Sequence, residues 1–590
     1  MSGKDEGGGG SFGSFKDLFK AKGEDVPEDD EPKGKGWTLE TDDDVGAAAK
    51  VEAFEGRGET PREVIDKRPA AFGPMTSGPP TYADVDSEEL ELVHSFRIRT
   101  VFPKDVLGEV GSLPEDPDPA EYGTRVDLRD ETIFTIDGAD AKDYDDAIHI
   151  RQLDGGIVEF GVHIADVSHY VVPGTKLDEE ALARGTSVYL PDQVVPMLPE
   201  ELSNHLCSLV EGRDRFAFSV IMQFDEKGDR LSYKVHKSVI KSCKRNTYKS
   251  VQELLDREDT PEAKAIEHLR EPLELFAKWT RRQQQRRDER GSLRMQSVER
   301  KFVFDEQHEV SGIVDAPRYF SQTLIEETAL AANQAVGDYF RERGLPTIYR
   351  VHPEKDPEEI EAVARLLLDH GLRVPDKDRL TGRDIARLIR AARRKPNADA
   401  LIQRIMGLIE RAVYEVKDHE DVATHFGLAR EAYLHFTSPI RRYPDLMVHR
   451  WLHKVSSEEA GAKEEIQTEA FLEDLNEVAQ HASMRADIAE MAERAVGDLK
   501  VCQYMDPHRG EVLDAEVRRV MPAGMEILLR QYNVVAFLPT RAIGRRGEVK
   551  GPTLTIQVGR GHRSFSEGYA IRVKIEEVDF LRLQLMLTLA

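Results

Sequence analysis

The sequence predicts an α+β protein of several domains, and three stretches of contrasting pattern support this prediction. Residues from about 85 to 250 alternate short strand-like runs with turns, and residues 250–500 are mainly helical in pattern. From about residue 509, five short strand-like runs follow one another. A chain of 590 residues also exceeds a single hydrophobic core, so two to four domains are expected.

The first 85 residues have the composition of a disordered tail. They contain a glycine run at 7–10 and acidic text rich in proline and glycine. Such a segment buries too little apolar surface to offset its ordering entropy. Phe12, Phe15 and Phe19 are candidates for a short docking helix that would contact a protein partner, but a degenerate tail is the favoured alternative.

Order is expected to begin near Glu88. We expect strands at 132–136, 157–165 and 217–224, and helices at 321–340, 357–370, 398–416 and 485–500. The last domain should contain strands at 511–520, 525–530, 534–538, 570–578 and 581–589.

Five short strands fit a small barrel, and the OB type is the form that commonly binds oligonucleotides. Met525 is expected at a position where such barrels often expose an aromatic side chain. An RNA-binding face would then depend on the remaining exposed residues, namely Tyr532, Phe537, Arg541, Arg545 and Arg546.

Composition limits the classes of function. A formal net charge of −27 argues against a generic nucleic-acid binder, although a recessed basic channel is compatible with it. Cys207, Cys243 and Cys502 are too widely spaced for a disulfide framework or a zinc site. No apolar run has membrane-spanning length. We expect a cytoplasmic monomer that does not contact a membrane.

The acidic loop at 137–146 is the strongest chemical signal. It places five carboxylates between two expected strands, at Asp137, Asp140, Asp143, Asp145 and Asp146. Converging carboxylates repel one another unless a cation lies among them, and closely spaced hard oxygen ligands suit Mg²⁺ or Mn²⁺. A solvated acidic turn is the alternative. A calcium loop is excluded, because Lys142 and Ile148 stand where that pattern needs Gly and Glu.

A further motif, the segment around Arg441 and Arg442, is weak when it is taken alone. Arg441 and Arg442 lie between Pro439 and Pro444, just before a helical pattern resumes at Asp445. Two guanidinium groups at a helix entrance can clamp phosphate oxygens, but arginine pairs are more often surface or salt-bridged features.

Basic residues also cluster at 281–290, where Arg281, Arg282, Arg286, Arg287 and Arg290 occur. They either line a channel for a phosphate backbone or form a solvated helix face balanced by nearby acidic residues. The sequence leaves both interpretations open.

Taken in order, these motifs resemble the ribonuclease II/R family of exoribonucleases, which is defined by the RNB domain. The matching segments are 126–129, 135–147, 164–168, 184–189, 196–207, 425–450 and 491–498. The resemblance covers about 85–500, and an S1-type RNA-binding domain is expected after it. It implies an RNB domain over 86–505 and an S1-like OB-fold over 506–590, after the disordered tail that composition predicts over 1–85.

The resemblance also implies roles for individual residues. Asp137, Asp143, Asp145 and Asp146 would gather around two Mg²⁺ ions, with Mn²⁺ as a substitute, and Asp143 and Asp145 would also take part in catalysis. Arg441 would offset charge in the transition state, and Tyr189 would stack on the 3′-terminal base. The remaining RNA contacts would come from Arg442, Glu493, and either Glu326 or Glu327 on a ribose hydroxyl. For the three glutamates a helix-surface salt bridge is the alternative.

The implied function is processive 3′-to-5′ hydrolysis of single-stranded RNA to nucleoside 5′-monophosphates. An RNA-binding regulator on an inactive RNB scaffold is the alternative, and a metal phosphatase or DNA exonuclease with a convergent acidic loop is a third possibility. Bacterial members of the family usually carry two cold-shock barrels before the catalytic domain. Here only the acidic tail is expected in that place.

Overall fold

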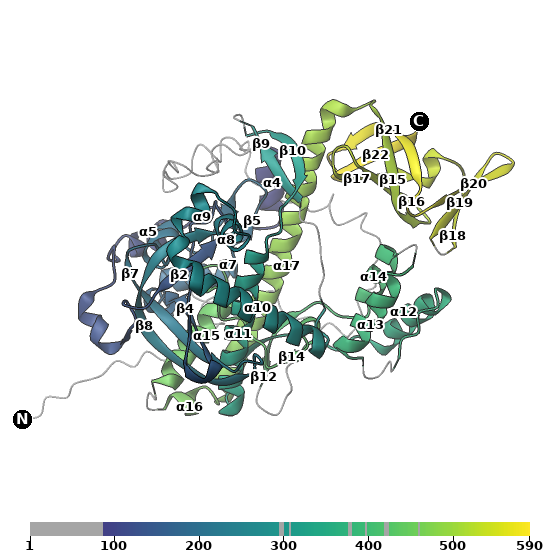
Figure 1. Ribbon diagram of the computed structural model, residues 1–590. Helices are drawn as coiled ribbons and strands as arrows, with labels where there is room; N and C mark the ends of the chain where they lie inside the picture. The colour runs from purple at the N-terminus through teal and green to yellow at the C-terminus, as the bar shows by residue number, and fades with distance from the viewer. Residues whose placement is uncertain are drawn as a thin grey trace, which may run out of the picture.

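The computed structural model describes residues 87–293, 300–305, 308–375, 380–395, 398–417, 424–457, 461–550 and 552–590. The predicted α+β class is confirmed, because a mixed sheet packs among helices and a separate closed barrel ends the chain (Figure 1). The tail predicted at 1–85 lies outside the described residues.

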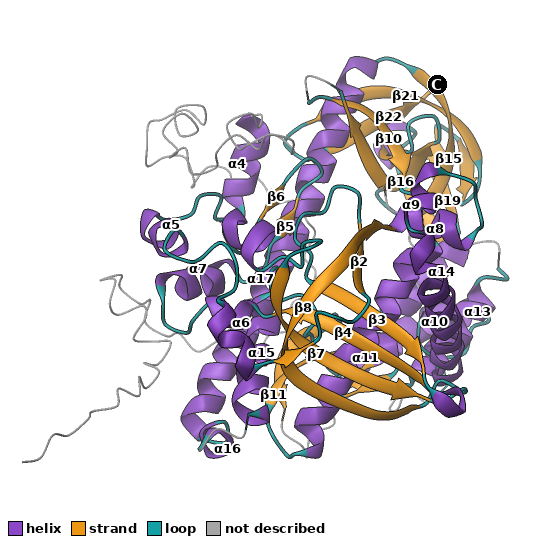
Figure 2. Cartoon of the chain, turned by 60° about the vertical axis from the view of Figure 1, so that its left-hand side comes forward, coloured by secondary structure: helices purple, strands orange, loops and turns teal. Residues whose placement is uncertain are grey.

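The part of the molecule that precedes the C-terminal barrel is called the larger part. A six-stranded sheet forms its centre, with the strand order β1-β8-β2-β3-β4-β7 (Figure 2). The long β8 pairs with β7 through its first part and with β2 through its second part. β8 therefore pairs with both β2 and β7, which lie at the two ends of the run β2-β3-β4-β7. The strands are β1 (Val126–Asp127), β2 (Ile133–Asp137), β3 (Asp146–Gln152), β4 (Val158–Ala165), β7 (Asp214–Phe224) and β8 (Arg230–Thr247).

The predicted strands at 132–136, 157–165 and 217–224 correspond to β2, β4 and β7. Nearly every residue of β4 is buried, so both of its faces are covered. Phe160 of β4 stacks on Trp279 with ring centroids 4.7 Å apart, and Phe276 lies beside both. These rings attach a long helix to the sheet and form part of the main hydrophobic core.

Helices surround the sheet, and the longest one reaches the barrel (Figure 1). This helix, α17 (Glu469–Met505), contacts the first helix, strands of the larger part, and two strands of the barrel. The others are α4 (Ser87–Ser95), α5 (Lys104–Val110), α6 (Val167–Tyr170), α7 (Lys176–Arg184), α8 (Tyr248–Leu255), α9 (Pro261–Ala265), α10 (Arg270–Arg290), α11 (Phe320–Glu342), α12 (Pro357–Asp369), α13 (Gly382–Ala392), α14 (Ala398–Met406), α15 (Tyr443–Ser456) and α16 (Ala462–Glu465).

One predicted helix is wrong in its second half. The segment 398–416 is helical only through α14, and residues 413–417 form β12 (Val413–Lys417). This strand pairs antiparallel with β11 (Thr347–Val351). Further short pairs are β5 (Val188–Tyr189) with β6 (Val194–Val195), β9 (Arg300–Phe304) with β10 (Val310–Asp315), and β13 (Thr424–His425) with β14 (Arg430–Glu431).

The C-terminal barrel contains the five predicted strands. Its order is β15-β16-β17-β22-β21, with β15 (Val512–Met521), β16 (Gly524–Leu529), β17 (Val534–Pro539), β21 (Ala570–Asp579) and β22 (Gln584–Leu589). A three-stranded sheet that the sequence analysis did not predict is inserted between β17 and β21, and consists of β18 (Gly547–Lys550), β19 (Thr553–Val558) and β20 (Gly561–Ser566).

Two residues expected on the exposed face of the barrel are buried. Met525 points into the barrel with Ile527, because alternate residues of β16 face inward. Tyr532 is 9% exposed and donates its hydroxyl to Glu511, beside Tyr504 at the end of α17. Both expectations are corrected, and the exposed basic side chains Arg541, Arg545 and Arg546 remain on the surface.

In the sequence analysis, no apolar run had membrane-spanning length. In the part of the chain that the structure describes, no helix combines the length and apolarity needed to cross a bilayer.

Candidate functional site

The acidic loop joins the ends of two neighbouring strands. Antiparallel pairing places Phe134 of β2 opposite Ile148 of β3, so the loop leaves and re-enters the sheet at the same end of the two strands. Asp137 is the last residue of β2, and Asp146 is the first of β3. This register brings the outer carboxylates of the loop to the same end of the sheet.

Side chains from distant segments fix the path of the loop. Ser208 Oγ donates to the Lys142 carbonyl at 2.8 Å and accepts the Tyr144 N–H at 3.0 Å. Arg245 of β8 donates through Nη2 to the carbonyls of Gly138 and Ala139, at 2.8 and 2.7 Å. Sequence reasoning missed Ser208 and Arg245, because nothing in their local text connects them with residues more than 60 positions away.

The carboxylates of the loop share an environment that disfavours negative charge. Burial, followed by the charge of Asp146, raises the pKa of Asp137 to about 8. Burial raises the pKa of Asp146 to about 6 and also raises the pKa values of Asp143 and Asp145. The positive charge of Arg441 opposes the increase at Asp143, Asp145 and Asp146.

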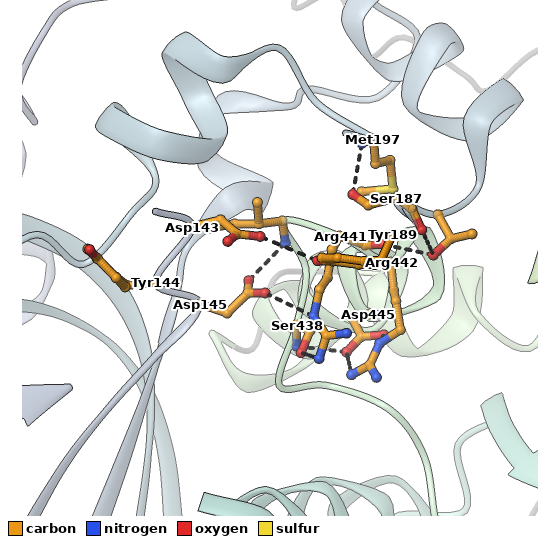
Figure 3. Close-up of polar contacts among 12 residues, drawn as sticks. Asp143, Tyr144, Asp145, Ser187, Tyr189, Met197, Ser438, Arg441, Arg442 and Asp445 are labelled. Atoms are coloured by element: carbon orange, nitrogen blue, oxygen red, sulfur yellow. Dashed lines mark hydrogen bonds and ion pairs between the residues drawn. The ribbon is translucent and has the colours of Figure 1, made fainter. Parts of the chain in front are cut away.

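Asp145 contacts the loop 437–442 before α15, called the arginine loop here because it contains Arg441 and Arg442 (Figure 3). Its Oδ1 accepts the Ile440 N–H at 3.0 Å, and its Oδ2 lies 3.7 Å from Arg441 Nε. Arg441 also donates to Ser438 Oγ at 3.1 Å. The Asp145 side chain is 6% exposed, whereas that of Arg441 is 41% exposed, so the guanidinium is accessible to a ligand beside a buried carboxylate.

Arg442 occupies a different environment from Arg441. It forms two hydrogen bonds with the carboxylate of Asp445, at 2.7 and 2.9 Å, and Asp445 is fully buried. This ion pair, together with burial, fixes the entrance of α15. The two arginines predicted as a joint clamp are therefore separated, with Arg441 facing the acidic loop and Arg442 bound to its own helix.

Tyr189 links the acidic loop to α17. Its backbone N–H donates to Glu493 Oε1 at 2.7 Å, and its hydroxyl lies 3.5 Å from Asp143 Oδ2. The Tyr189 side chain is nevertheless 41% exposed. Glu493 thus holds the backbone of Tyr189, and the Tyr189 ring projects beside the carboxylates (Figure 3).

Glu326 and Glu327 of α11 both contact the same arginine. Arg287 Nη1 lies 2.8 Å from Glu326 Oε1 and 3.0 Å from Glu327 Oε1. The side chain of Glu326 is 39% exposed, whereas that of Glu327 is 1% exposed. Glu326 is therefore the member of the pair that a ligand can reach.

The chemistry of the carboxylate set fits a hard divalent cation. All four side chains offer oxygen, and Asp137 Oδ2 is buried without a hydrogen-bond partner. As the side chains lie, however, no three His, Cys, Asp or Glu residues in the described ranges are gathered in an arrangement that could hold a metal ion. The close gathering of all four carboxylates, which the sequence analysis expected, is therefore not present as a ready-made cage.

Comparison with known proteins shows which family the chain resembles. An RNB domain model matches residues 125–458. The chain is 40% identical over 434 residues to ribonuclease R of Thermotoga maritima, covering 73% of this chain and 60% of that protein. It is 36% identical over 445 residues to ribonuclease R of Escherichia coli, covering 74% of this chain and 54% of that protein.

A solved structure shares the fold. Mycoplasma genitalium RNase R, in complex with ribose-methylated single-stranded RNA, matches with a TM-score of 0.75 at 24% identity, covering 85% of this chain and 78% of that one. The chain spans about 60% or less of the length of the two curated relatives described above. The RNB match extends over more than half of the sequence and includes both the acidic loop and the arginine loop. The chain therefore belongs to the RNB-domain family.

Proposed function

We propose that the chain is a hydrolytic exoribonuclease that degrades single-stranded RNA from its 3′ end to nucleoside 5′-monophosphates, processively. One observation carries this proposal. Asp143, Asp145, Tyr189 and Arg441 come from three separate segments, and their side chains meet at one place (Figure 3). Family membership supports the same conclusion.

Two divalent cations, Mg²⁺ or Mn²⁺, are proposed as cofactors held by Asp137, Asp143, Asp145 and Asp146. When bound, such ions would lower the pKa of a water molecule and neutralise phosphate oxygens. The raised pKa values of these carboxylates mean that protons compete with cations for them in the metal-free protein.

The remaining side chains bind and orient the RNA. Arg441 is positioned to neutralise charge that develops on the phosphate, a contribution of about 3 kcal/mol in comparable electrostatic sites. The exposed ring of Tyr189 offers a stacking surface for the terminal base. Glu493 orients Tyr189 through its backbone, and Glu326 is accessible for a ribose hydroxyl.

The flanking segments have proposed roles as well. We propose that residues 86–505 form the catalytic domain and that residues 506–590 form an S1-like domain, in which Arg541, Arg545 and Arg546 supply an exposed basic surface for RNA. The protein is proposed to act as a cytoplasmic monomer. A protein partner for residues 1–85 remains a prediction.

The decisive experiment follows the products of end-labelled RNA in Mg²⁺, with an EDTA control. Asp145→Asn should abolish hydrolysis and leave RNA binding measurable, because the amide keeps an acceptor for Ile440 N–H but removes the charge beside Arg441. Asp140→Asn is the matched control, since Asp140 lies on the same loop with its side chain 92% exposed. Turnover by Asp145→Asn would contradict the metal assignment.

The same experiment tests the alternatives. An RNA-binding regulator on an inactive scaffold would bind RNA and release no product under any metal condition. A DNA exonuclease with a convergent acidic loop would degrade an all-DNA oligomer as fast as RNA. Release of nucleoside 5′-monophosphates from RNA alone would contradict both.

A further inference from the structure

The basic end of α10 divides into an outward half and an inward half. Arg282 is exposed, and Arg286 is half-buried and paired with Asp229 near the surface. Arg287 turns inward with its side chain only 6% exposed, and Arg290 is partly buried. The solvated-face interpretation therefore describes the outer pair and does not describe the inner one.

A third arginine reaches the inner pair from a distant segment. The end of α10 is fastened to the turn before β14, because Leu293 N–H and Ser292 Oγ both donate to the Gly427 carbonyl, at 2.8 and 3.1 Å. Arg430 of β14 follows this turn, and its Nη1 makes one long contact of 3.5 Å with Gln334 Oε1. We call Arg287, Arg290 and Arg430 the inner arginine cluster.

The inner arginine cluster has buried donors without acceptors. Arg287 Nε, Arg290 Nε and Nη2, and Arg430 Nε are all buried and lack a hydrogen-bond partner. A buried donor left unsatisfied is destabilising, and more so when it is charged. Among the described residues, the carboxylates in contact with the cluster are Glu326 and Glu327, both bound to Arg287. Three guanidinium groups against two carboxylates leave uncompensated positive charge.

The electrostatics agree with this geometry. Burial, followed by the charge of Arg290, lowers the pKa of Arg430 to about 10. Burial and the charge of Arg286 lower the pKa of Arg290. An arginine is normally protonated beyond pH 12, so these shifts report buried guanidinium groups with further positive charge beside them.

We propose that the inner arginine cluster is a phosphate-binding site for internal phosphodiester groups of the RNA strand, an inference that rests on the proposed exoribonuclease function. Guanidinium groups present planar donor pairs that match phosphate oxygens. A phosphodiester supplies one negative charge and two free oxygens. The charge would offset the excess positive charge, and the oxygens would accept hydrogen bonds from the unsatisfied donors. The cluster shares Arg287 with the accessible Glu326, which is proposed to contact a ribose. Ribose and phosphate recognition would then be adjacent.

The test measures RNA binding as a function of salt in the full chain carrying Asp145→Asn, which prevents turnover. Arg430→Gln should weaken binding of a single-stranded RNA about tenfold. It should also reduce the slope of log K against log salt by about 0.7, the value for loss of one phosphate contact on a single strand. Arg282→Gln is the matched control, because Arg282 lies on the exposed side of α10. It should leave both quantities unchanged.

Thermal stability separates binding from a structural role. Because Arg430 has an unsatisfied donor among like charges, Arg430→Gln should leave the Tm unchanged or raise it. Inorganic phosphate should raise the Tm of the parent protein more than that of Arg430→Gln. A lowered Tm with unchanged RNA affinity and an unchanged salt slope would overturn the proposal and make the cluster structural.

The source of the phosphate is tested with nucleoside 5′-monophosphate. If the monophosphate raises the Tm of the parent but not of Arg430→Gln, and RNA affinity is the same in both, the assignment to the strand is overturned in favour of the released product. Failure of the exoribonuclease proposal is a distinct result. It would appear as absent turnover in the chain without Asp145→Asn, whatever the salt slopes show.

Discussion

At the scale of single residues, contacts from far along the chain hold the candidate site residues or the backbone that carries them. Glu493 of α17 fixes the Tyr189 backbone, Ser208 fixes the acidic loop, and Ile440 donates to Asp145. Such contacts restrict side chains that would otherwise lose orientation in solvent. Substitution at these positions should therefore change product distributions or rates more than it changes stability.

Tyr189 allows a direct test of the stacking role. Tyr189→Ala should alter the length of the final product, because the terminal base loses a stacking contact worth roughly 1–3 kcal/mol. Tyr189→Phe keeps the ring and removes only the hydroxyl near Asp143, so its product length should match that of the parent. Electrophoresis of 5′-labelled RNA at single-nucleotide resolution makes the comparison. An identical ladder for Tyr189→Ala would count against stacking.

At the scale of elements, α15 and the arginine loop before it behave as one unit. Asp445 in the first turn accepts the Ser438 N–H at 2.8 Å, and His449 Nε2 donates to the Phe436 carbonyl at 2.8 Å. Both acceptor and donor are buried. The helix therefore sets the path of the loop that carries Arg441.

This unit should weaken in acid. Burial lowers the pKa of His449 from 6.5 to about 4. The unfolded chain thus binds more protons than the folded one between those values, so stability is lost as pH falls below 6.5. For His449 alone, the free energy of unfolding should fall by about 2 kcal/mol between pH 7 and pH 5.

Urea unfolding at the two pH values measures this loss. His449→Gln should show a smaller pH dependence than the parent, since its amide can donate to Phe436 without titrating. His562→Gln, at an exposed position in the barrel domain, is the control and should retain the parent's dependence. Equal pH dependence in all three proteins would show that His449 is not responsible.

Local pattern and long-range pairing explain where sequence analysis succeeded and failed. The acidic loop, β2, β4 and the five barrel strands are local patterns, so they were predicted within a few residues. Residues 413–417 alternate Val, Tyr, Glu, Val and Lys, and they became β12 through pairing with β11, more than 60 residues earlier. Helix pattern alone could not reveal that partner.

The same reason limits prediction of the site. Asp137, Asp143, Asp145 and Asp146 could be selected as candidate metal ligands from one short segment, but the contacts of Ser208 and Arg245 depend on tertiary structure. The sequence also gave no indication that Arg430 joins Arg287 and Arg290. Met525 was assigned to the wrong face because inward alternation along β16 depends on where the barrel closes.

At the scale of the whole molecule, α17 connects the larger part to the barrel. Val501, Cys502 and Met505 near its end are buried in the same hydrophobic cluster as the barrel interior, and Ile313 of β10 joins them. The barrel therefore shares its core with the larger part of the molecule.

Two truncations should have different effects. Removing residues 510–590 uncovers the apolar end of α17, so the shortened protein should lose solubility and have a lower Tm. Removing residues 1–85 should leave turnover of a short unstructured RNA near that of the full chain. Sedimentation, thermal unfolding and product release distinguish the cases. Collapse of activity after the second truncation would show that the tail is not inert.

One helix carries both Glu493, which holds Tyr189, and the residues that hold the barrel. An α-helix turns by about 100° and advances by about 1.5 Å with every residue. A single residue inserted between 493 and 501 would swing the barrel a quarter-turn or more around the axis while barely changing its separation. Insertions of one or two residues in this stretch should thus be selected against, whereas an insertion of about seven residues, close to two full turns, would restore the angle and lengthen the helix by about 10.5 Å.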